Sequence, residues 1–194
     1  MKRITIAMAV VASTLLGGCD EPSSATKAEP APGTAPKATV EMSKSVPKGW
    51  IEDFDAAQKQ AAKEGKYILL AFSGSDWCGW CVRMDREIYS DKKFVNQAKR
   101  DFILVMIDSP RDKSILSELA ASQNRGLVRR FGVRGYPCSV LVRPDGSEVK
   151  RFSGYQSDGP SDFLKALKKA AADAGALAPQ AEGAAKPAAP VAAK

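Results

Sequence analysis

Two cysteines separated by two residues are the side chains in this sequence best placed to do chemistry. Cys78 and Cys81 lie in Ser75-Asp-Trp-Cys-Gly-Trp-Cys81, which follows an apolar run and opens a predicted helix. At this spacing, two thiols in the first turn of a helix can form a disulfide without moving the backbone. The unpaired N–H groups and the dipole of a helix N-terminus favour the thiolate of the first cysteine. We therefore expect Cys78 to be the nucleophile and Cys81, on the buried face, to be the resolving thiol.

The composition excludes most other catalytic chemistries. The chain has 194 residues and no histidine, so it holds no Ser-His-Asp triad, no Cys-His pair and no imidazole that could activate Cys78. A zinc site is one alternative for the pair, but with Cys138 as the only further thiol of the mature domain the ligand set is short of the usual four. A purely structural disulfide is another alternative, although so small a loop constrains little of the unfolded chain.

The segments at both ends of the sequence are predicted to lie outside the folded domain. Lys2 and Arg3 precede an apolar run, and Leu16-Gly-Gly-Cys19 resembles the lipobox of bacterial lipoproteins. This implies a signal peptide over residues 1–18 and lipidation of Cys19; an ordinary secretory signal with a coincidental cysteine is the alternative. Residues 19–46 and 177–194 are rich in Ala, Pro and Lys and lack aromatic residues, so we expect a disordered tether and tail. Residues 47–176 then form the one folded domain.

The charge balance indicates which partners an exported chain of this kind would meet. There are 29 Lys and Arg residues against 22 Asp and Glu residues, a net charge of +7. This modest excess favours an anionic membrane surface or acidic partners. No stripe interleaves basic and aromatic residues, so we expect no binding of nucleic acid.

The pattern of apolar residues predicts a mixed α/β domain. We expect strands over Tyr67 to Ser73, Phe102 to Asp108, Cys138 to Arg143 and Ser147 to Phe152. We expect helices over Asp53 to Glu64, from the Cys78 region through Ile88, and from an N-cap at Ser90 to about Lys99. Further helical segments are expected over Ser114 to Ala121, as a turn near Leu127 to Phe131, and from Ser157 to Asp162 onward. This order gives a mixed central sheet with helices on both faces, ending in an antiparallel hairpin and a helix.

The element order and two separated motifs resemble the thioredoxin family. Besides the Cys78 motif, Phe131-Gly-Val-Arg-Gly-Tyr-Pro-Cys138 precedes a strand. The continuation Glu87-Ile-Tyr-Ser-Asp91 is similar to the C-terminal domain of the bacterial membrane thiol:disulfide interchange reductase. The likeness covers roughly residues 50 to 172. It implies a thioredoxin fold and a thiol:disulfide oxidoreductase that works through a Cys78–Cys81 redox disulfide, with no other cofactor and no metal.

The resemblance also implies a substrate-binding role for three neighbours of the dithiol. Pro137 matches a proline that follows a cis peptide bond and faces the cysteines, and Tyr136 would present backbone groups to an extended substrate. An ordinary proline at the start of an edge strand is the alternative. Trp77 resembles the tryptophan that shields the disulfide. Trp80 stands where the family commonly has proline.

Three departures from the family limit what carries over. Ala71 stands where thioredoxins have a buried aspartate that accepts the proton of the second cysteine, so Cys81 would need water or another group. Four arginines, Arg125, Arg129, Arg130 and Arg134, form either a solvated basic face or a site for an acidic partner or a favoured thiolate. Cys138 is either a buried small residue, a third redox partner of Cys81, or a thiol that binds Cu(I) with the pair.

These observations favour a lipid-anchored, extracytoplasmic thiol:disulfide oxidoreductase of the bacterial envelope, in the periplasm. Disulfides persist outside the cytosol, so the expected partners are the thiols and disulfides of exported proteins, which it would reduce or isomerise. Reduction there requires an electron donor, which we expect to be a membrane thiol-transfer protein. The alternative is a non-catalytic thioredoxin-fold module that binds polypeptides at Tyr136–Pro137, or a copper-related thiol chaperone.

Overall fold

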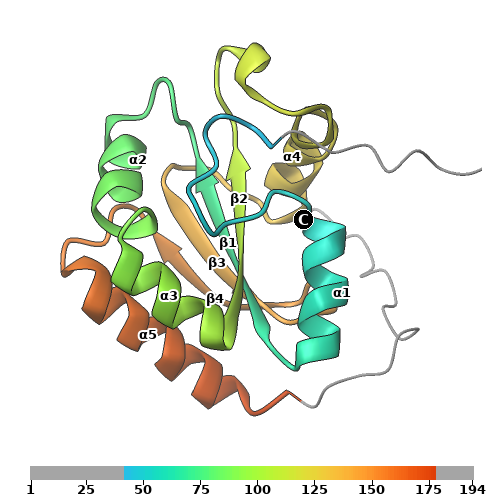
Figure 1. Ribbon diagram of the computed structural model, residues 1–194, viewed down its shortest axis with the longest axis vertical. Coiled ribbons are helices and arrows are strands. Elements are labelled where there is room, and N and C mark those ends of the chain that lie inside the picture. The colour runs from blue at the N-terminus through green and yellow to red at the C-terminus, as the bar shows by residue number, and fades with distance from the viewer. Residues whose placement is uncertain (1–41, 178–194) are drawn as a thin grey trace, which may run out of the picture. The chain divides into compact units, whose positions relative to one another are not determined.

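A mixed four-stranded sheet forms the centre of the domain (Figure 1). The computed structural model describes residues 42–177, so the predicted signal peptide, Cys19, most of the tether and the tail lie outside the described residues. The strands are β1 (Tyr67–Ser73), β2 (Phe102–Asp108), β3 (Cys138–Val142) and β4 (Glu148–Ser153), in the order β2-β1-β3-β4. β1 is parallel to β2, whereas β3 is antiparallel to both β1 and β4. The predicted mixed sheet and C-terminal hairpin are therefore confirmed.

Helices cover both faces of the sheet, as predicted (Figure 1). They are α1 (Phe54–Glu64), α2 (Gly79–Met84), the π-helical turn η1 (Asp85–Tyr89), α3 (Lys92–Asp101), the short 3-10 turn η2 (Lys113–Ile115), α4 (Glu118–Arg130) and α5 (Gly159–Ala174). Leu69 and Ala71 of β1 belong to a core with Met84, Phe94 and Phe163, beneath η1, α3 and α5. The alternate residues Ile68, Leu70 and Phe72 belong to a second core beneath α1 and α4.

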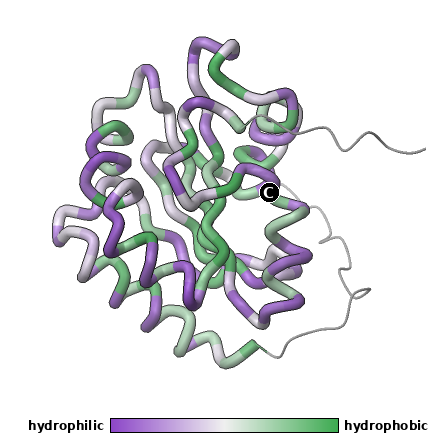
Figure 2. Tube along the Cα trace, viewed as in Figure 1, coloured by the Kyte–Doolittle hydropathy of each residue, from purple (hydrophilic) through white to green (hydrophobic). Residues whose placement is uncertain are grey.

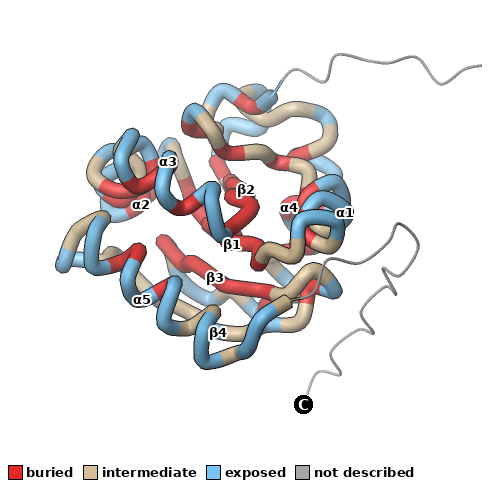
Figure 3. Tube along the Cα trace, turned by 60° about the horizontal axis from the view of Figure 1, so that its bottom comes forward, coloured by how far each residue is buried: buried red, intermediate tan, exposed pale blue. Residues whose placement is uncertain are grey.

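Burial on both faces explains why β1, β2 and β3 are largely apolar along their whole length. Every residue of β1, β2 and β3 is buried, and the hydropathy and burial colouring show the same apolar strands inside the layers (Figures 2 and 3). A strand covered by helices on two sides has no solvent face to occupy with polar residues. The edge strand β4, in contrast, is only partly buried and carries Glu148, Lys150 and Arg151.

The start of α3 differs from the prediction by one residue. Its N-cap is Asp91, whose carboxylate accepts the backbone N–H of Phe94 at 2.7 Å, and not the expected Ser90. The preceding helix continues through η1, and the N–H of Ser90 closes that turn on the carbonyl of Asp85 at 2.8 Å. Because Ser90 ends one helix, the next residue must begin the following one.

The two helical pieces expected between Ser114 and Phe131 are one longer helix. α4 has 13 residues and begins after Ser117, whose hydroxyl accepts the N–H of Ala120 at 3.1 Å. Residues Lys113–Ile115 form only the η2 turn. The helix continues through Gly126 because Ala120, Asn124 and Leu127 form one buried face, and tertiary packing of that face outweighs the low helix propensity of glycine.

Contacts of the folded unit begin upstream of residue 47, within the segment assigned to the tether. The N–H of Ser43 donates to the carboxylate of Glu52 at 3.0 Å, and the Ser43 hydroxyl accepts the N–H of Ser117 at 2.8 Å. The N–H of Lys44 donates to the carbonyl of Ile115 at 3.0 Å. Within residues 42–177, no helix combines the length and the apolar character that crossing a bilayer would require.

The corrected N-cap gives a stability prediction. Asp91→Ala removes the side-chain acceptor of α3 and should lower the free energy of unfolding of the full chain by about 1 kcal/mol. Ser90→Ala, the comparison variant, should cost less than Asp91→Ala, because the exposed Ser90 hydroxyl accepts no N–H of α3 and donates only to the carboxylate of Asp85. Urea denaturation followed by far-ultraviolet circular dichroism measures both. A larger loss for Ser90→Ala than for Asp91→Ala would contradict the assignment.

Candidate active site

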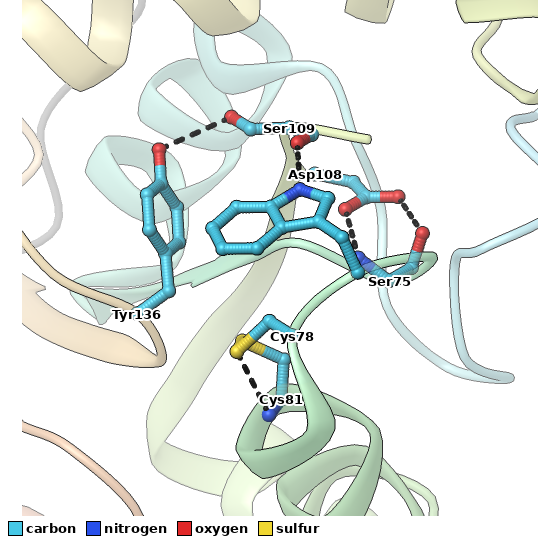
Figure 4. Close-up of a disulfide and its surroundings, with 7 residues drawn as sticks. Ser75, Cys78, Cys81, Asp108, Ser109 and Tyr136 are labelled. Carbon is cyan, nitrogen blue, oxygen red and sulfur yellow. Dashed lines mark hydrogen bonds between the residues drawn. A yellow bond between two sulfur atoms is a disulfide. The ribbon is translucent and has the colours of Figure 1, made fainter. Parts of the chain in front are cut away.

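The structure brings the two motif cysteines together as a disulfide at the start of α2 (Figure 4). Their Cα atoms are 5.1 Å apart. Cys78 is the N-cap residue with extended backbone, and its Sγ accepts the N–H of Cys81 at 3.2 Å. Cys81 lies one turn inside and is 1% exposed, against 8% for Cys78. The first sulfur therefore lies at the helix N-terminus, with a backbone N–H directed at it, as the sequence predicted.

Three consecutive residues before Cys78 are hydrogen-bonded to the last residue of β2 and to the segment that follows it. The N–H and hydroxyl of Ser75 donate to the carboxylate of Asp108, at 3.0 and 2.5 Å (Figure 4). The carboxylate of Asp76 accepts the backbone N–H groups of residues 111 and 112, at 2.9 and 2.8 Å, and those two bonds lower its pKa. The indole N–H of Trp77 donates to the carbonyl of Ser109 at 2.8 Å. The loop that carries Cys78 is therefore held on the end of β2.

The close-up shows Tyr136 on the side of Trp77 that faces the disulfide region, and Pro137 follows Tyr136 in the chain (Figure 4). The peptide bond between Tyr136 and Pro137 is cis. The rings of Trp77 and Tyr136 meet edge to face with centroids 5.4 Å apart, and both side chains donate hydrogen bonds to Ser109 (Figure 4). A Cβ atom at Gly74 would overlap the indole of Trp77, so this position admits only glycine while the ring keeps its place.

A pocket of about 400 Å³ adjoins the proline. It is lined by Gly132, Arg134, Gly135, Tyr136, Pro137, Cys138, Arg151, Ser153 and Gly154. The N–H of Gly154 donates to the carbonyl of Pro137 at 2.9 Å, which joins the proline to the loop after β4. The backbone around the cis bond is thus accessible from this side.

Sequence reasoning left the proton acceptor of Cys81 open and did not consider Asp85, a half-buried carboxyl group one helical turn away in the sequence. Ala71 is fully buried and supplies no polar atom. Asp85 follows Cys81 by four residues, the spacing that places two helical side chains on one face. Burial raises the pKa of Asp85, the negative charge of Asp108 adds to this, and a hydrogen bond from Ser90 opposes it. The i, i+4 spacing was the signal that could have identified Asp85.

Two arginines that the sequence analysis singled out, Arg83 and Arg130, interact with side chains other than the cysteines. Arg83, the nearest in sequence to Cys78, donates from Nε to both carboxylate oxygens of Glu87 at 3.1 Å. The guanidinium of Arg130, one of the four arginines of the basic segment, lies 5.4 Å from the ring centres of both Phe54 and Phe131. Arg130 is therefore part of the packing, whereas Arg125, Arg129 and Arg134 are exposed. In the described part of the chain, the hydrogen bond to the Sγ of Cys78 comes from backbone.

Cys138 is a buried free thiol at the start of β3. It is 3% exposed, pairs with Phe72 of β1 and belongs to the core beneath α1 and α4. Burial raises the pKa of its thiol, while Arg151, whose Nη1 lies 3.7 Å from Sγ, opposes that shift. Among residues 42–177, no three Cys, Asp or Glu side chains are grouped closely enough to hold a metal ion.

Comparisons with known proteins agree with this arrangement. Residues 54–171 match the family model described as a thioredoxin-like domain. The chain is 29% identical over 119 residues to disulfide bond reductase DsbH of Chlamydia pneumoniae, covering 61% of this chain and 70% of that protein. It is 26% identical over 121 residues to thiol:disulfide interchange protein DsbD of Ralstonia nicotianae, covering 62% of this chain and 18% of DsbD.

A solved structure gives the same result for the fold. The structure of a DsbH oxidoreductase superposes with a TM-score of 0.58 and 26% identity, covering 74% of this chain and 93% of that one. The thioredoxin fold, the resemblance and the enzyme class predicted from the sequence are confirmed. The chain belongs to the thioredoxin-like family of thiol:disulfide oxidoreductases.

Proposed function

We propose that this protein is a membrane-anchored, extracytoplasmic oxidoreductase that reduces or isomerises disulfides of envelope proteins. The observation that carries the chemistry is the Cys78–Cys81 disulfide at the start of α2, beside the cis peptide bond that precedes Pro137. The names of the relatives support the direction, since DsbH is called a disulfide bond reductase and DsbD an interchange protein. Membrane anchoring rests on the lipobox that ends at Cys19.

In the first step, the thiolate of Cys78 attacks one sulfur of a partner disulfide. A bond forms between Cys78 and that sulfur, the partner's S–S bond breaks, and the other partner sulfur leaves as a thiolate that takes a proton from water. The backbone N–H of Cys81, 3.2 Å from the Sγ of Cys78 in the oxidised form, is directed at the atom that carries the charge. Extended backbone at Tyr136 would align the partner segment.

In the second step, Cys81 loses its proton and attacks the Sγ of Cys78. The mixed disulfide breaks, the second partner thiol is released, and the protein dithiol has been oxidised by two electrons. We assign the proton to the carboxylate of Asp85, directly or through one water, because Ala71 offers no acceptor. A membrane thiol-transfer protein would then return two electrons to the Cys78–Cys81 disulfide.

The redox chemistry is tested by titrating the full chain against defined thiol/disulfide buffers and counting alkylated thiols by mass. A reducing or isomerising enzyme should show one reversible two-electron transition, at a potential between about −270 and −180 mV. A transition near about −120 mV would instead indicate an oxidant. With a disulfide-bonded substrate, Cys81→Ser should accumulate a mixed disulfide and its matched partner Cys78→Ser should not. No reversible transition in any buffer would exclude the dithiol mechanism.

The assignment of Asp85 predicts a pH-dependent second step. The acceptor form is the ionised carboxylate, and its pKa is raised, so resolution of the mixed disulfide should slow as the pH falls through that raised pKa. Asp85→Asn should slow resolution about tenfold or more at neutral pH and flatten this dependence. Rapid acid quenching and mass analysis of the mixed disulfide measure the step. The control is Asp162→Asn, an exposed acid on α5. Equal rates in the two variants would refute the role of Asp85.

Cys138 should act as a packing residue and not as a third redox thiol. Cys138→Ala removes one buried sulfur and should leave the rate of disulfide exchange and the two-electron count unchanged. In the wild-type protein, the Cys138 thiol should be alkylated only after unfolding, because it is 3% exposed. Turnover and alkylation of both proteins check this. Loss of turnover in a variant with an unchanged circular dichroism spectrum would show that Cys138 takes part in exchange.

A further inference from the structure

Exposed apolar side chains gather around the reactive cysteine. Trp77 is 39% exposed, Trp80 57% and Val82 48%. Among the large hydrophobic residues of the described segment 42–177, only Met42 is exposed to a similar degree. Single exposed apolar residues are ordinary on a protein surface, but a group of them marks a surface that binds something.

Trp80 is held in place although it is exposed. Its ring lies 5.6 Å from that of Tyr155, which belongs to the loop between β4 and α5, and the two planes differ by 33°. The guanidinium of Arg83 lies 4.7 Å from the centre of the Tyr155 ring and 5.7 Å from that of Trp80. The two rings and the guanidinium therefore form one contiguous surface.

Glu87 connects Arg83 and Tyr155 through hydrogen bonds to its carboxylate. Its carboxylate accepts hydrogen bonds from Arg83 at 3.1 Å, from Arg86 at 2.9 Å and from the hydroxyl of Tyr155. The pKa of Glu87 is lowered to about 2, chiefly by the hydrogen bond from the Tyr155 hydroxyl. The carboxylate therefore stays charged at any physiological pH. Exposed ion pairs contribute little to folding stability, so this fixed geometry does little for the fold itself. We call Trp80, Arg83, Glu87 and Tyr155 the Trp80–Tyr155 surface.

The Trp80–Tyr155 surface is continuous with the backbone around the cis bond. The N–H of Gly154 donates to the carbonyl of Pro137 at 2.9 Å, and Tyr155 is the next residue. The loop between β4 and α5 lies against η1, the turn that follows α2, because the hydroxyl of Tyr155 donates to the carboxylate of Glu87 (Figure 1). A polypeptide segment that lies along Pro137 would therefore come next to Gly154 and Tyr155, and Trp80 packs on Tyr155.

The charges beside this surface favour an acidic group on the partner. Arg83 and Arg86 share the single carboxylate of Glu87, and the side chain of Arg86 is 71% exposed. The half-buried Asp85 is held by Ser90. Arg86 therefore presents an exposed guanidinium beside Glu87, which is bonded to Tyr155 next to the exposed ring of Trp80.

We propose that the Trp80–Tyr155 surface binds the polypeptide segment that follows the partner's cysteine and selects segments carrying an apolar residue next to an acidic one. The apolar side chain packs on the rings of Trp80 and Tyr155, and the acidic side chain pairs with Arg86. Rigid aromatic rings and arginine are the residue types that dominate binding energy at protein interfaces. This proposal rests on the proposed disulfide exchange at Cys78 and specifies its substrate class.

The probes are symmetric disulfides of three short peptides. In the first peptide, leucine and glutamate follow the cysteine; the second has lysine in place of the glutamate, and the third has glycine in place of the leucine. Reduced full chain attacks each probe through Cys78, so the protein dithiol becomes a disulfide while the probe is reduced to two peptide thiols. Hydroxyethyl disulfide, small and uncharged, reports the reactivity of the dithiol alone. Acid quenching, alkylation and mass analysis give each rate constant.

The wild-type protein should react about tenfold faster with the Leu-Glu probe than with either altered probe. To compare variants, each peptide rate is divided by the rate of the same variant with hydroxyethyl disulfide. Tyr155→Ala should reduce the preference for leucine to within about twofold, and Tyr155→Phe, which keeps the ring, should retain it. Arg86→Glu should favour the lysine probe. The matched control Arg100→Glu, on α3 beside the residues that precede β1, should behave like wild type.

Three results would overturn the proposal. Wild-type rates for the three peptides that agree within about twofold would show no selection. Unchanged selectivity in both Tyr155→Ala and Trp80→Ala would place the selection elsewhere. Concentration-dependent dimerisation that Trp80→Ala abolishes would assign the surface to a second copy of this chain. Failure of the proposed function is distinct from all three, because the reduced protein would then react with no probe, hydroxyethyl disulfide included.

Discussion

The attachment of residues 75–77 to residues 108–112 is the constraint on which the site depends. Asp108 is 2% exposed at the end of β2 and accepts both polar hydrogens of Ser75, and its own carbonyl accepts a hydrogen bond from the amide of Asn124. The central sheet, the helix α4 and the loop before Cys78 are thereby joined in one network. Because this network fixes where α2 begins, it also fixes which sulfur receives the N–H groups of the first turn.

Backbone groups carry much of the electrostatics at the dithiol. The chain has no histidine, and Arg83 is engaged by Glu87 and Tyr155. The N–H that points at the Sγ of Cys78 belongs to Cys81 and cannot titrate or move to another partner while α2 is intact. Reactivity built on a helix N-terminus therefore depends on the helix staying folded, which links the chemistry directly to the packing of Met84 and Ile88 beneath it.

The sequence predicted the parts of the fold that depend on local pattern. The apolar runs of β1, β2 and β3 are buried, and Cys81 lies on the buried face of its helix, as expected. The errors fall where a neighbouring element decides the outcome. Ser90 and Asp91 are both good N-caps, and only the length of the preceding turn chooses between them. Gly126 has a low helix propensity, which favours ending the helix there, but the packing of the buried face of α4 keeps the helix continuous.

The candidate site divides in the same way. Cys78, Cys81, Trp77, Tyr136 and Pro137 could be recognised from two motifs, because the chemistry requires them at fixed spacing. Asp108, Ser109 and Tyr155 could not, since each acts through a contact across a long stretch of sequence: 33 residues from Ser75 to Asp108, 32 from Trp77 to Ser109 and 68 from Glu87 to Tyr155. Contacts of this kind leave no periodic signal in one sequence.

The two tryptophans of the motif show how reactivity and selectivity are separated in this molecule. Trp77 is bonded to the carbonyl of Ser109, and its ring fills the space above Gly74, so its position is part of the scaffold that holds Cys78. Trp80 is more exposed, at 57% against 39% for Trp77, and its ring lies beside Tyr155 and the guanidinium of Arg83. Changes in the Trp80–Tyr155 surface can therefore alter which partner approaches while the first turn of α2, and with it the sulfur chemistry, keeps its geometry.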